Sequence, residues 1–235
     1  ISRNMIICNR KSLLNGNAFV LGVSGSGKSF IAKEEMAFVA MATDDDIIIV
    51  DPEREYEMLI KSLGGEVIRF SPDSKNYINA LDMSKDYGDG DNPLTLKSSF
   101  VMSLYENLNN GKIDGGANSI VDRCMKNIYK EYIAEKSNQP PTLKELRQEL
   151  LKQDEPLAKE IALSLELFTE GSLNVFSHQT NVNLNNRIIC YDTLDLGKQL
   201  KSIGMLIMLD SILNRIMENR KAGKRTWVYI DEIYL

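Results

Sequence analysis

The chain has 235 residues, 43% of them hydrophobic, and carries 28 lysines and arginines against 33 aspartates and glutamates. This length suits one large α/β domain or a core with an insertion, and the net charge of -5 argues against a protein that coats nucleic acid through bulk charge, although a local basic channel stays open. The single histidine, His178, excludes a histidine-based metal site or triad, and the scattered Cys8, Cys124 and Cys190 are expected to be reduced thiols of a cytosolic protein.

No apolar run approaches the roughly 20 residues that a membrane-spanning helix needs, and no secretory leader is visible at Ile1. The sequence lacks an initiator methionine and ends soon after Glu232, so we expect a fragment of a longer protein. Any membrane attachment would then come from a partner or from another part of that protein.

The first predicted elements surround a glycine-rich loop. Strand-type residues occur at 5–8 and again at Ala18–Leu21, and the segment 29–43, rich in Ala, Met, Lys and Glu, predicts a helix. Between them, residues 22–29 read Gly-Val-Ser-Gly-Ser-Gly-Lys-Ser and match the phosphate-binding pattern G-x-x-x-x-G-K-[ST]. A strand, a loop and a helix in this order are the context that the pattern requires.

The chemistry of such a loop explains its residue types. Glycines let backbone N–H groups approach a polyphosphate, and the start of the following helix favours anions. We expect Lys28 to reach the β- and γ-phosphates and the Ser29 hydroxyl to hold Mg²⁺. The predicted nucleotide-binding residues are Ser24, Gly25, Ser26, Gly27, Lys28, Ser29 and Phe30.

The next segment joins an acidic turn to a buried strand. Residues 44–46 are three aspartates, interpreted as a solvated turn rather than a cation site, and the β-branched run Ile47–Val50 predicts a fully buried parallel strand. The following stretch, Asp51–Tyr56, has two open interpretations. It is either a helix entry or a functional turn that places Glu53 or Arg54 near the γ-phosphate.

The middle of the chain changes from strands to helices. A helix is predicted at 55–63, ended by two glycines, followed by a strand at 66–70 and a loop over 77–92. Between 93 and 170 the apolar spacing is helical, with Thr142 and Glu145 forming a capping-box pattern. A buried strand at 187–191 and a long helix at 198–218 follow, and the basic run 220–225 is interpreted as a solvated turn rather than a DNA or subunit contact.

A second motif completes the expected site. The apolar run Thr226–Ile230 predicts a buried strand that leads directly into Asp231 and Glu232, which is a Walker B pattern. We expect Asp231 to hold Mg²⁺ and Glu232 to act as a general base on the attacking water. On its own this pattern is weak, but together with the phosphate loop it favours ATP hydrolysis over passive nucleotide binding.

The predicted fold is α/β: a P-loop NTPase of the RecA-like type, with a parallel doubly wound sheet and an all-helical insertion. We divide it into a first part of the ATPase core (1–92), a helical insertion (93–170) and a second part of the core (171–235).

The phosphate loop, the Asp-Pro-Glu-Arg-Glu-Tyr stretch and the terminal Asp-Glu together resemble the motor ATPases of conjugation and type IV secretion, the family of the fourth VirB protein, in the HerA–FtsK-like branch. The resemblance implies hydrolysis of ATP to ADP with Mg²⁺ to power channel assembly or transfer of DNA or protein. It also implies a homo-oligomer, a ring or dimer, that works with other secretion components at the cytoplasmic face of the inner membrane. Lys28, Glu232 and Glu53 are then the expected catalytic residues, with Glu53 a sensor or second acid, and Ser29 and Asp231 the metal ligands.

Two alternatives remain at this point. A HerA–FtsK-type DNA translocase or coupling protein shares the core and its chemistry, and would bind DNA with a steep salt dependence. A nucleotide-switched structural scaffold would bind ATP without turning it over, and Glu232 is the feature against it.

Overall fold

A computed structural model describes residues 9–84, 87, 92–109 and 111–232, so the strand expected at 5–8 and the thiol of Cys8 lie outside the described residues. Its centre is a four-stranded sheet of β1 (Asp46–Asp51), β2 (Glu66–Arg69), β3 (Ile188–Asp192) and β4 (Thr226–Ile230). The spatial order is β2-β3-β1-β4 and each neighbouring pair is parallel, as expected. All carboxyl ends therefore meet at one edge.

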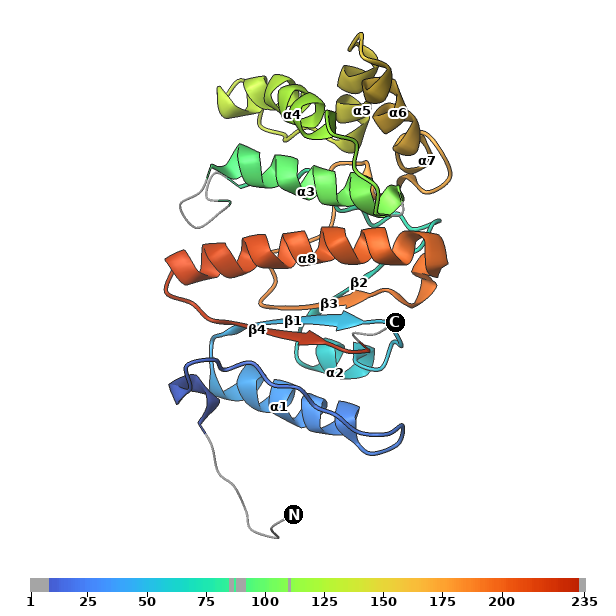
Figure 1. The fold of residues 1–235 in the computed structure, drawn as a ribbon. Helices are drawn as coiled ribbons and strands as arrows, with labels where there is room; N and C mark the ends of the chain where they lie inside the picture. The colour runs from blue at the N-terminus through green and yellow to red at the C-terminus, as the bar shows by residue number, and fades with distance from the viewer. Residues whose placement is uncertain (1–8, 85–86, 88–91, 110, 233–235) are drawn as a thin grey trace.

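Helices cover both faces of this sheet (Figure 1). One face carries α1 (Lys28–Ala42) and α2 (Glu57–Ser62), and the other carries the long α8 (Gly197–Lys221). Beyond α8 lies the helical part, made of α3 (Pro93–Leu108), α4 (Ala117–Ile133), α5 (Leu143–Leu151), α6 (Pro156–Ser164) and α7 (Glu166–Thr169). The described residues also form three short 3-10 turns: η1 (Arg10–Ser12), η2 (Asn174–Phe176) and η3 (Leu194–Leu196).

Successive side chains of a strand point to opposite faces of the sheet, which explains why there is one hydrophobic core on each face. In β1, Ile48 and Val50 face the core under α8, whereas Ile47 and Ile49 face the smaller core under α1 and α2. The strand β3 repeats this pattern, with Ile189 on one side and Cys190 on the other. Both strands are buried on both faces, which is why their sequences read as uninterrupted apolar runs.

The helical part shares the larger core with the sheet. Tyr105 of α3, Tyr129 of α4 and Leu146 of α5 are fully or almost fully buried in the same hydrophobic cluster as Ile48. The expected capping box is present at the start of α5, where Glu145 accepts the backbone N–H of Thr142 at 2.9 Å. The helices expected between residues 93 and 170 are therefore present. That this segment is a unit separate from the ATPase core stays a prediction.

The strand expected at Ala18–Leu21 is absent, so that prediction is wrong. These residues form no strand, and the side chains of Phe19 and Leu21 are 78% and 79% exposed. A strand needs hydrogen bonds to a neighbour, and none of the described strands pairs with this segment. Apolar composition alone could not reveal which partner the segment would need.

The three aspartates at 44–46 are not a simple solvated turn either. Only Asp44 is exposed; Asp45 accepts a hydrogen bond from Trp227 Nε1 at 2.9 Å. Asp46 is buried and binds Arg215 and Asn219 of α8, as well as Lys224 of the basic run. Buried carboxylates persist when cations and amides satisfy them. The sequence pattern did not reveal these partners, because Arg215 and Asn219 lie 169 and 173 positions away.

Candidate functional site

The phosphate loop passes directly into α1. Gly25 and Gly27 have φ angles of 75° and 88°, in the left-handed region that glycine enters at no steric cost. Gly27 precedes the first helical residue, Lys28, and no side chain caps the helix start. The first backbone N–H groups of α1 have no acceptor within their own helix, so they are available to an anion.

The loop is closed by its own backbone. The Ser26 N–H donates to the carbonyl of Val23 at 3.1 Å, and Lys28 Nζ lies 3.5 Å from the same oxygen. Gly22 sits so close to Ser26 that an added Cβ would lie 2.4 Å from the Ser26 hydroxyl oxygen. A side chain at position 22 would therefore displace the Ser26 hydroxyl and press on the Ser26 Cβ, 3.2 Å away, so glycine suits this tight turn.

The end of β4 supplies the second half of the site. Because β4 pairs with β1, the backbone N–H of Asp231 donates to the carbonyl of Val50 at 3.2 Å. The two carboxylate oxygens of Asp231 are both occupied: Oδ2 accepts the Tyr56 hydroxyl at 2.8 Å and Oδ1 accepts the Glu232 backbone N–H at 3.0 Å. Glu232 has a φ of 46°, so the chain turns sharply directly after the strand.

The two halves meet in one pocket of about 250 Å³. Every predicted site residue except Ser26 lines this pocket. The backbone N–H of Ser26 instead closes the loop by its hydrogen bond to Val23. Glu53 is present, whereas Arg54 is not. The lining residues are Ser24, Gly25, Gly27, Lys28, Ser29, Phe30, Glu53, Glu55, Asp231 and Glu232.

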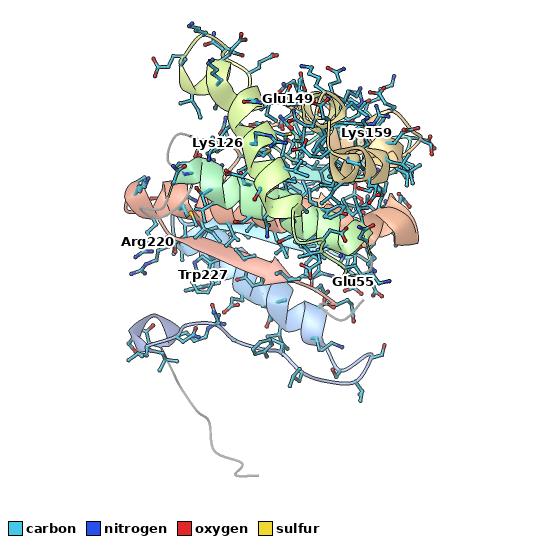
Figure 2. All side chains as sticks on the ribbon, turned by 45° about the horizontal axis from the view of Figure 1, so that its top comes forward. Glu55, Lys126, Glu149, Lys159, Arg220 and Trp227 are labelled. Carbon is cyan, nitrogen blue, oxygen red and sulfur yellow. The ribbon has the colours of Figure 1, made fainter. Side chains whose placement is uncertain are left out.

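The turn after β1 explains how Glu53 comes to this pocket. Asp51 accepts the backbone N–H groups of Glu55 and Tyr56 at 3.0 and 2.9 Å, which bends the chain back over the strand end. Arg54 has a φ of 58° and points away from the loop, with its guanidinium 2.5 Å from both Asp192 and Asp195. In Figure 2 Glu55 lies near the carboxyl end of β4, and Trp227 near its beginning.

Sequence reasoning missed two residues of this turn, Glu55 and Tyr56. The side chain of Tyr56 is 2% exposed. Burial is the main reason that the pKa of Tyr56 lies far above its usual value, and the hydrogen bond to Asp231 is the second. The Ser29 hydroxyl acts in the opposite direction but does not cancel this increase in the pKa. Tyr56 therefore stays protonated and donates to Asp231. In the sequence, the place of Tyr56 in the Asp51–Tyr56 motif was the one sign of a role for it. Its contact with Asp231 could not be predicted, because the two residues are 175 positions apart.

The residues fit a nucleotide with a divalent cation. Four carboxylates, those of Glu53, Glu55, Asp231 and Glu232, line the pocket with the single cation Lys28, so a polyphosphate would need a counterion there. The described residues contain no cluster of three or more metal-binding side chains. Mg²⁺ is commonly held by one or two carboxylates together with the phosphates of a nucleotide, and the carboxylates of this pocket are residues of that type.

Comparisons with known proteins bear on the family and the fold of the chain. The family model described as an AAA-like domain matches residues 9–233. Among solved structures, the chain is similar to VirB4 of Thermoanaerobacter pseudethanolicus, with a TM-score of 0.74 and 24% identity over 88% of this chain and 81% of that one. This likeness shows a shared fold. No curated protein matches the chain. No helix in the described parts of the chain is both long and apolar enough to cross a membrane.

Proposed function

The chain belongs to the AAA-like domain family of P-loop ATPases, and from this premise we propose that it is the ATP-hydrolysing motor of a type IV secretion or conjugation machine. One observation carries the enzymatic part: the phosphate loop and the Asp231–Glu232 pair line the same pocket. The type IV secretion part is supported by the Asp51–Tyr56 motif and by the likeness to VirB4.

Each residue has a proposed task. The N–H groups at the start of α1 and Lys28 bind the phosphates, and Ser29 and Asp231 hold Mg²⁺. When bound, Mg²⁺ neutralises phosphate charge in a pocket that is otherwise rich in carboxylates. Glu232 accepts a proton from the attacking water, and Glu53, on the turn after β1, is a second acid in the wall of the same pocket.

The wider setting is part of the same proposal. The motor acts as a homo-oligomer, a ring or a dimer, at the cytoplasmic face of the membrane and in contact with other secretion components. ATP is its nucleotide and ADP its product. Its task is channel assembly or the transfer of DNA or protein.

The first prediction tests hydrolysis. We expect Lys28→Ala to lose nucleotide binding and turnover, and Glu232→Gln to lose turnover by at least about 100-fold while it still binds nucleotide, because only the general base is removed. Steady-state ATPase assays of the full-length protein, run across protein concentration, together with nucleotide titrations, measure both effects.

A specific activity that rises with protein concentration would support the oligomeric motor. Nucleotide binding without turnover in any assembled form would overturn the motor and favour a nucleotide-switched scaffold. Turnover that Glu232→Gln leaves unchanged would remove Glu232 from the catalytic role. Glu34→Gln is a matched control, because it also replaces a glutamate by glutamine. Glu34 is exposed on α1 and does not line the pocket.

A further inference from the structure

We infer that Tyr56 is a positioning residue that fixes the two predicted magnesium ligands, Ser29 and Asp231, before the nucleotide arrives. The inference rests on the proposed function, because it assigns a role at the same metal site. Tyr56 does not line the pocket, so it acts through its neighbours.

The tyrosine is held at both ends. Its backbone N–H donates to Asp51 Oδ2 at 2.9 Å, at the end of β1, and its hydroxyl donates to Asp231 Oδ2 at 2.8 Å, at the end of β4. The side chain is 2% exposed, and Lys33 Nζ of α1 lies 5.2 Å from the centre of its ring. A ring packed in this way has few alternative rotamers, so the hydroxyl has a fixed position.

This hydroxyl reaches both predicted ligands. It donates to Asp231, and the Ser29 side chain on α1 also interacts with it. The other oxygen of Asp231 accepts the Glu232 N–H at 3.0 Å, so the carboxylate is restrained from two sides. Groups that orient metal ligands in this way usually strengthen metal binding by 10- to 100-fold.

The contact also links three elements that lie far apart in sequence. Ser29 belongs to α1, Tyr56 to the turn before α2, and Asp231 to the end of β4. A single hydroxyl therefore ties the phosphate loop to the Walker B strand. Without it, the carboxylate of Asp231 would keep only the hydrogen bond from the Glu232 N–H among the hydrogen bonds described for it.

The test is the variant Tyr56→Phe, which keeps the ring and its packing and removes only the hydroxyl. We expect the Mg²⁺ concentration that half-saturates magnesium-dependent binding of a fluorescent ADP analogue to rise by about 10-fold or more. Binding of the same analogue in EDTA should remain unchanged, since the phosphate loop is intact. Thermal unfolding without nucleotide verifies that the variant is folded.

A matched control comes from β4 itself. The buried Tyr229 hydroxyl has no hydrogen-bond partner among the described residues, so Tyr229→Phe removes the same group without touching Asp231. We expect its Mg²⁺ dependence to equal that of the wild type. An effect of Tyr229→Phe as large as that of Tyr56→Phe would overturn the inference.

A double-mutant cycle with Asp231→Asn separates positioning from general packing. If Tyr56 acts through Asp231, then Tyr56→Phe weakens MgADP binding in the wild type and has little further effect in the Asp231→Asn background. Additive losses, or an unchanged Mg²⁺ dependence of Tyr56→Phe, would overturn the inference and leave the proposed function intact. A wild-type protein that binds no nucleotide would overturn both.

Discussion

At the scale of the residue, Asp46 shows how a buried charge is kept. Burial on its own would raise the pKa of Asp46, but hydrogen bonds from Lys224, Asn219 and Arg215 outweigh it and hold the pKa below its usual value. A carboxylate whose folded-state pKa is lowered stabilises the fold above its unfolded-state pKa of about 3.9, and this contribution is lost as the pH falls through the folded value.

We therefore expect Asp46→Asn to lower the free energy of unfolding by about 3 kcal/mol near pH 7, because two cations lose their partner. The difference from the wild type should begin to shrink as the pH falls below the unfolded-state pKa of about 3.9, and it should disappear once the pH has fallen through the lowered folded-state pKa of Asp46. Urea unfolding at the two pH values measures this. The exposed neighbour Asp44 gives the control, and a loss in Asp44→Asn as large as that in Asp46→Asn would contradict the assignment.

The residues of the candidate site differ in how far the sequence could predict them. The phosphate loop is predictable because its chemistry requires fixed residue types at fixed spacing. Glu53 and Glu55 follow a buried strand, but only the bend imposed by Asp51 brings them to the pocket wall. The bond from Tyr56 to Asp231 depends on which strands are neighbours, and no local pattern encodes that order.

At the scale of the element, the connection from α2 to β2 depends on a close approach. Gly64 has a φ of 75° and ends the helix, and Gly65 lies against the helix and the neighbouring strand. A Cβ at Gly65 would lie 2.7 Å from Ile60 Cγ2 and 2.9 Å from Ile188 Cβ. These contacts are shorter than van der Waals separations, so either α2 or β3 would have to move.

We expect Gly65→Ala to lower the free energy of unfolding by about 1–3 kcal/mol through this overpacking. Gly115→Ala is the matched control, because a Cβ there meets no atom within 4 Å. Thermal or urea unfolding compares the two. Equal stability of Gly65→Ala and the wild type would show that the α2–β2 connection adapts without cost.

The elements themselves were predictable where burial left a clear pattern. β1, β3 and β4 were expected from apolar runs, and the bounds of α1 and α8 differ from expectation by only a few residues. The burial expected of β4 is wrong, because β4 lies at the edge of the described sheet and all five of its residues are half-buried. The segment 18–21 has the same apolar character and yet forms no strand, since pairing depends on a neighbour rather than on composition. Arg215 and Asn219, the partners of Asp46 on α8, could not be predicted either, because contacts between distant segments leave no local pattern in the sequence.

At the scale of the whole molecule, one buried ion pair joins the helical part to the core. Lys97 of α3 is fully buried, and its Nζ lies 2.5 Å from Asp210 Oδ2 of α8. The ammonium also lies 4.3 Å from the ring centre of Tyr87 and 5.0 Å from that of Phe100. The pair is thus enclosed by aromatic rings between two layers of helices.

We expect Asp210→Asn to destabilise the protein by about 3–5 kcal/mol, because it leaves a buried ammonium without a counter-charge. Adding Lys97→Met should restore much of the loss, since the orphaned charge is then gone. The exposed pair of Lys126 and Asp122 within α4 is the control, and Asp122→Asn should cost no more than about 0.5 kcal/mol. A double variant no more stable than Asp210→Asn would argue against the buried charge as the cause.

The pairing of β1 with β4 also affects the order in which the molecule can be made. During synthesis, the phosphate loop and β1 leave the ribosome long before β4, with the whole helical part between them. The helices can pack through contacts close in sequence, whereas the pairing of β1 with β4 must wait until β4 has been made. The Asp231–Glu232 half of the nucleotide pocket therefore joins the phosphate loop only after the helical part has been synthesised.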